Sequence, residues 1–365
     1  MLALINLSTE LFFWFLAVGA LVLVVIFWSK LAKSSFRYVF LRVSSLVLIQ
    51  VLIVVSAGIT INRSGNFYES WGDLFGSKKN LAKIAISPTA LSAISSKDLA
   101  SATRTAGGSL IFKEVITGAK SKVSDYVYVV TSPTISKLLL AKNSSGIGTN
   151  YQVVELFPGY PGVPQTWIGT MGGITTMENL ENSGQIKPTI AIIPAINVVA
   201  GQDTECLNYV GGAQVETWLT ADTKTLAKNF VGIDDRLWSS FGYSTGGWCA
   251  AEVAVRHPEQ YAQAISLAGY FEPTFAFGIN SRERNFLSNK YDLIKTLKAT
   301  SSNLKMLTIA SKRDKYSYFS TKRFIAASSN LISVKFDEIP NGGHNIKVWK
   351  PYVATGFLWL NAVAP

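Results

Sequence analysis

A serine between glycines stands where an apolar run meets a helix-like segment. The motif Gly242-Tyr243-Ser244-Thr245-Gly246-Gly247 follows residues 237–241, which are mostly apolar, and precedes residues 248–256, which have a helical pattern. A serine on a sharp strand-to-helix turn needs small neighbours, and it exposes its hydroxyl beside a helix N-terminus that favours negative charge. The pattern predicts that Ser244 is a nucleophile. The alternative is an ordinary glycine-rich turn.

Only two histidines are available as a general base for this serine. His257 precedes Pro258 at the end of the helix after the serine, where a histidine typically caps the helix C-terminus. His344 lies in a glycine-rich loop after the apolar strand at 332–339, as the base of an α/β-hydrolase does. We expect His344 to activate Ser244, because a free serine hydroxyl is a poor nucleophile at neutral pH. The competing interpretation is a surface histidine.

The base needs a carboxylate that fixes its tautomer and stabilises the imidazolium. Asp314 stands between the serine and the histidine, directly after the apolar run 306–310, at the end of a strand where α/β sheets carry ligand-facing groups. We expect Asp314 to orient His344, although it could instead pair with the lysines and arginine beside it. The competing acids are Glu272, Glu283, Asp292, Asp337 and Glu338.

An earlier loop can supply half of an oxyanion hole. Residues 151–157 are typical of a strand, and they lead into Pro158-Gly159-Tyr160-Pro161-Gly162. In α/β-hydrolases one backbone N–H comes from the loop after this strand and one from the residue after the nucleophile. Proline cannot donate, so the sequence favours the N–H groups of Tyr160 and Thr245.

From about residue 62 onward the chain resembles the actinobacterial putative-esterase family, which is related to esterase D and the mycolyltransferases. Several motifs carry this resemblance in the same order along the chain. They lie at 70–76, 156–162, 203–206, 216–222, 242–250 and 342–345, the last followed by Trp349.

The resemblance implies an α/β-hydrolase fold that acts on an ester through a Ser-Asp-His triad. It favours an acyl ester of a lipid or a glycan as the substrate. Hydrolysis is the first expectation, and transfer of the acyl group to a sugar hydroxyl is the alternative. A non-catalytic scaffold of the cell envelope that keeps the fold is a second alternative.

Two long apolar stretches open the chain and predict a membrane anchor. Residues 11–28 and 43–61 carry no charged side chain, and each is long enough to cross a hydrocarbon core of about 30 Å. A cleaved signal peptide is the alternative for the first, but it would need a basic start. The loop between them carries Lys30, Lys33, Arg37 and Arg42 and no acid, which predicts that this loop is cytoplasmic and the rest of the chain is outside.

The two cysteines, Cys206 and Cys249, both lie in the part predicted to be exported. Cysteines outside the cytoplasm are usually paired, so a Cys206–Cys249 disulfide is expected, with two buried thiols as the alternative.

The 365 residues therefore divide into three predicted parts. Residues 1–62 form two transmembrane helices, at about 4–28 and 43–61, and residues 63–106 form a connector. Residues 107–365 form the catalytic domain, where strands and helices alternate as in a mostly parallel sheet with helices on both faces. Residues 270–290 show no clear period. Their phenylalanines 271, 275, 277 and 286 either line an acyl pocket or belong to the core.

Composition argues against other kinds of partner. The net charge of +11 would attract anionic lipids or acidic wall polymers, but a simple lysine bias explains it equally well. No motif interleaves basic and aromatic residues, so nucleic acid is not expected. Two distant histidines without H-x-x-H or C-x-x-C spacing leave too few ligands for zinc. No metal and no cofactor are expected, and the oligomeric state is not indicated.

Overall fold

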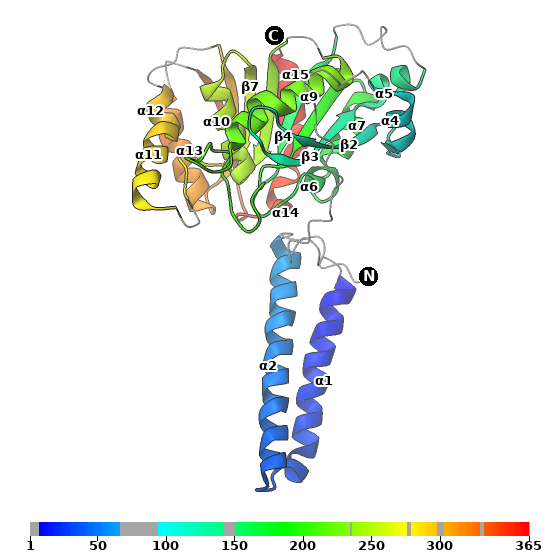
Figure 1. Ribbon diagram of the computed structural model, residues 1–365, viewed down its shortest axis with the longest axis vertical. Coiled ribbons are helices and arrows are strands. Elements are labelled where there is room, and N and C mark those ends of the chain that lie inside the picture. Colours follow the sequence, from blue (N-terminus) through cyan, green and yellow to red (C-terminus); the bar gives the residue numbers. More distant parts are fainter. Residues whose placement is uncertain are drawn as a thin grey trace. The chain divides into compact units, whose positions relative to one another are not determined.

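The computed structural model describes residues 7–65, 94–141, 150–233, 236–275, 279–297, 303–328 and 332–364. The chain divides into two compact units, Met1–Lys79 and Asn80–Pro365 (Figure 1). The motif at 70–76 that contributed to the resemblance lies outside the described residues, as does Phe277.

The first unit is a hairpin of two helices, α1 (Leu7–Leu31) and α2 (Phe36–Gly65). Helix α1 has the length of the predicted span 4–28 but lies three positions later, whereas α2 is longer than the predicted span 43–61 and begins seven positions earlier. One end of the hairpin is joined by polar contacts. Thr60 Oγ1 donates to Glu10 Oε1 at 2.9 Å and accepts from Trp14 Nε1 at 3.1 Å.

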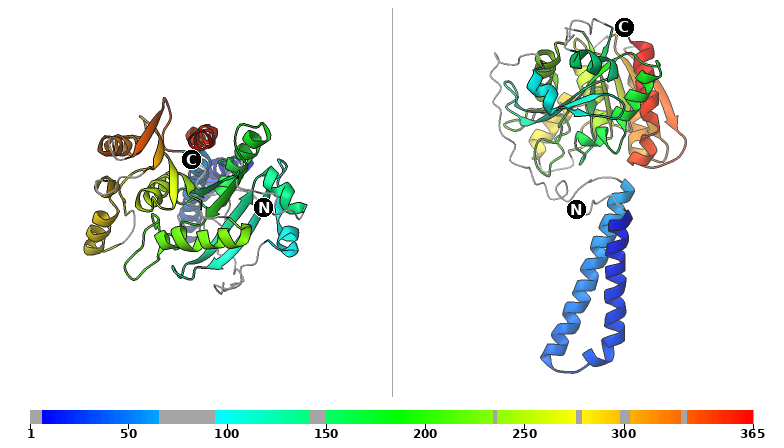
Figure 2. Two further views of the ribbon diagram at one scale, coloured as in Figure 1. Left: turned by 90° about the horizontal axis from the view of Figure 1, so that it is seen from above. Right: turned by 90° about the vertical axis from the view of Figure 1, so that its right-hand side faces the viewer.

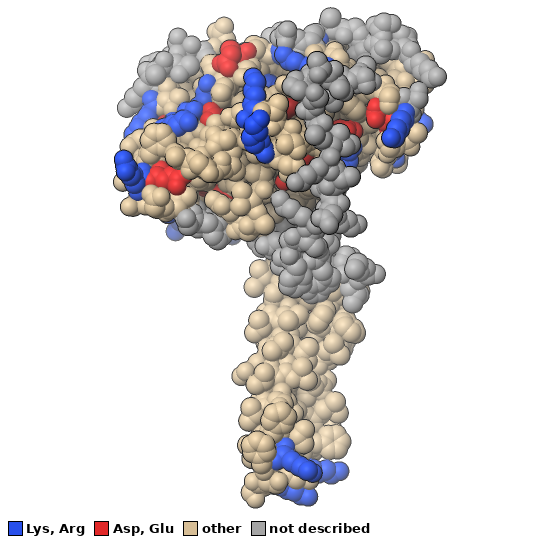
Figure 3. All heavy atoms as spheres, viewed as in Figure 1, with Lys and Arg blue, Asp and Glu red and all other residues tan. Residues whose placement is uncertain are grey.

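Each helix of the hairpin is long and apolar enough to cross a membrane. The apolar parts, Ser8–Leu31 and Phe36–Ile61, have 24 and 26 residues. At 1.5 Å per residue the shorter one extends about 36 Å, which exceeds a hydrocarbon core of about 30 Å. A signal sequence near an N-terminus meets the same criterion. Figure 3 shows Lys and Arg side chains gathered at the loop end of the hairpin, whereas the visible length of the helices carries none.

The second unit is built on a mixed sheet of nine strands in the order β1-β2-β3-β5-β4-β6-β7-β8-β9. Strands β5, β4, β6, β7, β8 and β9 are parallel, and β1, β2 and β3 add an antiparallel edge beside β5. The strands are β1 Thr103–Arg104, β2 Leu110–Thr117, β3 Ser124–Thr131, β4 Gln152–Phe157, β5 Thr189–Pro194, β6 Trp238–Tyr243, β7 Tyr261–Leu267, β8 Lys305–Ser311 and β9 Ser333–Ile339.

Helices cover both faces of this sheet (Figures 1 and 2). The second unit has α4 Ser96–Ser101, α5 Pro133–Leu140, α6 Gln165–Ile168, α7 Gly173–Asn182, α8 Val215–Thr217, the π-helical turn η2 Trp218–Asp222, α9 Thr223–Val231, α10 Thr245–Arg256, α11 Ser281–Tyr291, α12 Leu293–Leu297, α13 Lys315–Ser328, α14 Ile346–Trp349 and α15 Tyr352–Val363.

Two hydrophobic cores result, one on each face. Side chains alternate between the faces along each strand, so Ile190 and Ile192 of β5 enter one core, whereas Ala191 and Ile193 enter the other. Helices α9, α10 and α13 pack into the first core, and α7 and α15 into the second. This arrangement is the α/β-hydrolase fold that the sequence predicts.

Some details differ from the prediction. Helix α11 occupies the second half of the segment 270–290, in which the sequence shows no clear hydrophobic periodicity. Asp222 stands at the N-terminus of α9, but its side chain makes no cap bond there. Its carboxylate accepts instead from the backbone N–H groups of Lys120 and Ser121, and so holds the turn between β2 and β3.

Candidate active site

Ser244 lies on a sharp turn between β6 and α10, in a strained backbone conformation with φ 56° and ψ −126°. The residues two positions before and after it must be glycines because the turn is packed tightly on itself. A methyl group at Gly242 would lie 1.8 Å from the carbonyl oxygen of Gly246, and one at Gly246 would lie 2.2 Å from that of Phe157 in β4. The backbone N–H of Ser244 donates to Leu267 O of β7 at 2.9 Å. The turn is thus fixed between the ends of two strands.

Three side chains from separate parts of the sequence form a hydrogen-bonded chain at this turn. Ser244 Oγ lies 2.7 Å from Nε2 of His344, and Nδ1 of His344 lies 2.6 Å from Oδ2 of Asp314. The carboxylate is buried, whereas the imidazole is 42% exposed. The ring is therefore open to solvent on one side and hydrogen-bonded to a buried acid on the other.

Contacts with α14 and with the end of β8 hold the loop that carries His344. Gly342 has φ 113°, and a side chain there would strike Val348 of α14. Ser311 Oγ, at the end of β8, donates to the carbonyl of Gly342 at 2.6 Å and so ties this loop to the strand that precedes Asp314. The ring of Trp349 packs edge-on against the ring of His344, with 4.6 Å between the ring centroids.

The five competing acids all have partners elsewhere. Glu272 pairs with Arg323, and Glu283 accepts from the N–H of Val210. The other three pair with lysines: Asp292 with Lys295, Asp337 with Lys335, and Glu338 with Lys312. Among the described acids, Asp314 is the one within hydrogen-bond distance of His344.

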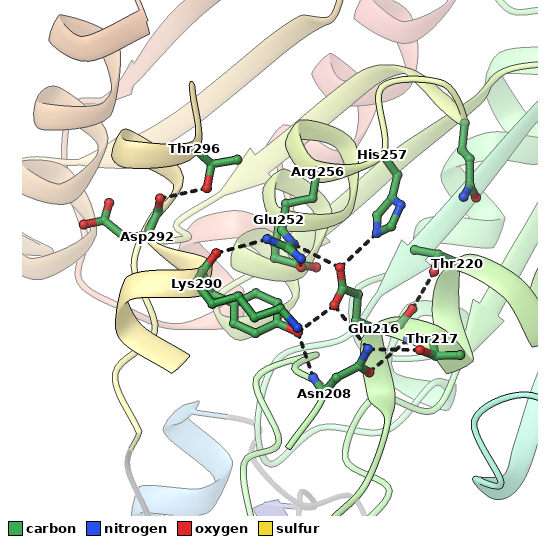
Figure 4. A network of polar contacts seen from close by, with 12 residues as sticks. Asn208, Glu216, Thr217, Thr220, Glu252, Arg256, His257, Lys290, Asp292 and Thr296 are labelled. Atoms are coloured by element: carbon green, nitrogen blue, oxygen red, sulfur yellow. Dashed lines mark hydrogen bonds and ion pairs between the residues drawn. The ribbon is translucent and has the colours of Figure 1, made fainter. Parts of the chain in front are cut away.

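The second histidine belongs to a different network, shown in Figure 4. His257 is the C-cap of α10, and its Nε2 lies 2.9 Å from Oε1 of Glu216, which also pairs with Arg256 at 2.9 Å. Tyr291 donates to the other oxygen of Glu216 at 2.6 Å. Burial alone would raise the pKa of Glu216, but the bonds from His257 and Arg256 lower that pKa to about 2. The carboxylate therefore stays ionised.

The loop after β4 lies directly against the serine. A methyl group at Gly159 would be 3.1 Å from Cβ of Ser244 and 3.2 Å from the carbonyl of Tyr243. Tyr160 follows in this loop and forms a cis peptide bond with Pro161. On the other side of the serine, Thr245 is the first residue of α10, where backbone N–H groups have no partner within the helix.

Cys206 and Cys249 form a disulfide that links the segment after β5 to helix α10. Two buried acids, Asp203 and Glu205, precede Cys206 and lie close to Thr245. Oδ2 of Asp203 accepts from Thr245 Oγ1 at 3.0 Å, and Glu205 accepts from the hydroxyl of Tyr270 at 3.1 Å. Burial, together with the neighbouring charge of Glu205, raises the pKa of Asp203 to about 7.

Sequence reasoning gave these two acids no role at the site. They stood in a motif of the resemblance at 203–206, and two acids on either side of a threonine, directly before a cysteine, were the available signal.

The phenylalanines expected to line either a pocket or the core differ in burial. Phe271 is fully buried and stacks on Phe324 with ring centroids 4.0 Å apart, and Phe275 is also buried. Phe286 is 54% exposed on α11. The core interpretation thus holds for the first two. Among the residues that the structure describes, no three His, Cys, Asp or Glu side chains are grouped to hold a metal ion.

No protein-family model matches the chain. A curated relative from Corynebacterium glutamicum, itself described as an uncharacterized protein, is 28% identical over 227 residues. The match covers 57% of this chain and 52% of the relative, so the chain spans about half the length of the curated relative that it matches.

Several solved structures share the fold at low sequence identity. A ferulic acid esterase aligns with a TM-score of 0.58 and 13% identity, over 70% of this chain and 98% of its own. The S-formylglutathione hydrolase of Agrobacterium tumefaciens gives 0.57 and 14%, over 71% and 97%. A fluorophosphonate-binding serine hydrolase of Staphylococcus aureus, FphF, gives 0.55 and 16%, over 69% and 98%. The chain therefore has the fold of these hydrolases.

Proposed function

We propose that this protein is a membrane-anchored serine esterase that cleaves a carboxylic ester through Ser244, His344 and Asp314. The observation that carries the proposal is the chain of two short contacts, 2.7 Å from Ser244 to His344 and 2.6 Å from His344 to Asp314. This arrangement is what a serine nucleophile needs in order to lose its proton as it attacks. The shared fold with several esterases supports the same reaction class.

In this mechanism Ser244 Oγ attacks the carbonyl carbon while His344 Nε2 takes the serine proton. Asp314 stabilises the resulting imidazolium, and the backbone N–H groups of Thr245 and Tyr160 bind the oxyanion. The C–O bond to the alcohol then breaks, and His344 returns the proton to the leaving alcohol. Water, deprotonated by His344, then attacks the acyl carbon. The bond from this carbon to Ser244 Oγ breaks, His344 returns the proton to the serine oxygen, and the acid is released.

Two features support anchoring with the catalytic unit outside the cytoplasm. Helices α1 and α2 are long enough to cross a bilayer, and the loop between them carries basic residues, which cytoplasmic loops favour. The Cys206–Cys249 disulfide is typical of an oxidising compartment. An anchored enzyme on that side would encounter acyl esters of lipids or envelope glycans.

Hydrolysis of p-nitrophenyl esters by the full chain in detergent micelles tests the proposal. We expect turnover and fluorophosphonate labelling in the wild type and neither in Ser244→Ala, with turnover also lost in His344→Ala. Ser183→Ala and His257→Gln are matched controls. Ser183 Oγ donates to carbonyls at the end of α7 and accepts from the side chain of Gln185, and its bonds involve no residue of the triad. Glutamine at position 257 can still donate to Glu216. Unlabelled wild type, or equal turnover in Ser244→Ala, would refute the serine mechanism.

The same acyl-enzyme can be resolved by a sugar hydroxyl in place of water. Product analysis with an added sugar acceptor separates the two outcomes, because transfer yields a new acyl ester and hydrolysis yields only the free acid. Protease digestion of intact cells tests the sidedness: an outward catalytic unit is cleaved, whereas a cytoplasmic one is protected.

A further inference from the structure

Residues 195–206, the first part of the connection from β5 to α8, pass both predicted donors of the oxyanion hole. The order of the sheet explains this course. Strand β4 lies between β5 and β6, so a segment that leaves β5 toward the start of α10 must cross the end of β4. The loop at 158–162 follows β4, and Ser244 follows β6. One segment therefore meets both sides of the site.

Its first contact is with the loop after β4. Nδ2 of Asn197 donates to the carbonyl of Gly162 at 2.9 Å and to that of Gly159 at 3.4 Å. These two carbonyls stand on either side of Tyr160, so a single amide group spans the turn that presents the Tyr160 N–H. The same turn lies against Cβ of Ser244.

Its second contact is with the residue after the nucleophile. The carboxylate of Asp203 accepts from the hydroxyl of Thr245 at 3.0 Å, and both side chains are buried, with 6% and 4% of their surface exposed. Because water does not reach this buried hydrogen bond, no water molecule competes for the carboxylate or the hydroxyl. It therefore fixes the backbone at Thr245, and with it the direction of that residue's N–H.

The segment itself is firmly held between these two contacts. Thr204 donates to the carbonyl of Ile196 within the segment, and Trp218 Nε1 donates to that of Ala195 at 3.0 Å. At its far end Trp248 Nε1 donates to the carbonyl of Glu205 at 2.7 Å, and the disulfide at Cys206 joins it to α10. The two contacts are thus connected by a segment whose backbone is held by hydrogen bonds and a disulfide.

We propose that residues 195–206 act as a clamp that sets the separation of the two oxyanion donors, with Asn197 and Asp203 as its positioning residues. The inference rests on the proposed esterase function. Neither side chain is assigned a contact with the substrate or the triad. The oxyanion forms only in the transition state, so a loosened clamp lowers kcat and leaves ground-state binding nearly unchanged.

Asn197→Ala in the full chain tests the first contact. We expect kcat for a p-nitrophenyl ester to fall on the order of 10- to 100-fold, because small misplacements at a reacting centre have effects of this size. KM should stay within about twofold. Fluorophosphonate labelling should slow in parallel, and the pH profile of kcat should keep its midpoint, because His344 and Asp314 are untouched.

Asn361→Ala is the matched control. The amide of Asn361 also donates to a backbone carbonyl, that of Gln185, but in the region of α15 and outside the clamp. The Asn361→Ala variant should lose some thermal stability and keep its kcat. If Asn197→Ala keeps its kcat while Ser244→Ala abolishes turnover, the clamp is refuted and the proposed esterase function still stands. Loss of activity in Asn361→Ala as well would reduce Asn197 to a general folding role.

Thr245→Val tests the second contact independently, since valine has the shape of threonine and lacks the hydroxyl that Asp203 accepts. We expect a similar fall in kcat at constant KM, so the proposal stays testable if Asn197→Ala does not fold. In the double variant the losses should combine to less than their product, because both contacts control one separation. Losses that multiply would show two independent contacts and overturn the clamp.

Discussion

An Asp314→Asn variant removes one negative charge beside His344 and barely changes the shape of the side chain. In the structure Oδ2 of Asp314 is 2.6 Å from Nδ1 of His344. When His344 takes the serine proton, the two charge centres are about 4 Å apart, and an effective dielectric of about 20 gives an attraction of about 4 kcal/mol. At about 1.4 kcal/mol per factor of ten, kcat should fall about 10³-fold.

The loss should come from the charge and much less from the orientation of the ring. Within the described part of the chain, the other oxygen, Oδ1, accepts one long hydrogen bond, from the N–H of Ser317 at 3.5 Å. With its carbonyl oxygen turned toward Nδ1, an asparagine keeps the tautomer that leaves Nε2 free to accept the serine proton, but its NH2 group then faces the N–H of Ser317. Asp314→Ala removes this acceptor as well, so its kcat should be lower than that of Asp314→Asn.

The assay is kcat for p-nitrophenyl ester hydrolysis by the full chain in detergent, with the melting temperature of each variant measured alongside. Glu338→Gln is the matched control, since it neutralises a nearby carboxylate whose partners are Lys312 and Tyr318. Its kcat should stay within about twofold of wild type, as for most surface changes. An Asp314→Asn variant with at least a tenth of the wild-type kcat would refute the electrostatic argument, and a 10³-fold loss in Glu338→Gln would reassign the acid.

Three further predictions concern stability and packing. The disulfide closes a loop of 43 residues, so replacing Cys206 and Cys249 by serine should lower the free energy of unfolding by about 4 kcal/mol. An unchanged urea midpoint would contradict this. Burial and Glu205 raise the pKa of Asp203 to about 7. The folded state therefore binds more protons than the unfolded state between about pH 4 and 7. The free energy of unfolding should fall as pH rises through this window, and it should fall less steeply in Asp203→Asn. If urea titrations give both proteins the same slope of this free energy against pH, the prediction is wrong. Gly246→Ala should abolish turnover, since its methyl group would lie 2.2 Å from Phe157 O, whereas Gly343→Ala, with no atom within 4 Å, should fold normally.

Most strands could be predicted from the sequence because buried strands are apolar runs. Strands β4 and β8 were predicted within one residue of their observed ends. Helix α11 was missed because its surface is largely polar, with only Leu287 and Tyr291 buried among its eleven residues. A helix with so narrow an apolar stripe gives little periodic signal.

The candidate site was predictable to different degrees. Ser244 was identifiable because its turn requires glycines on both sides, which is a local constraint written in consecutive residues. His344 followed from the small number of histidines. Asp314 was one of six acids, and the 2.6 Å contact with His344 distinguishes it from the others.

By itself, the sequence determined the alternation of strands and helices, the turn around Ser244, the two apolar helices and the number of residues able to serve as base. These properties depend on residues within a few positions of one another. Only the tertiary structure decided the partners of Asn197 and Asp203, which contact residues 35 and 42 positions away. Such contacts exist because β4 lies between β5 and β6 in the sheet, and strand order depends on long-range packing that no local pattern encodes.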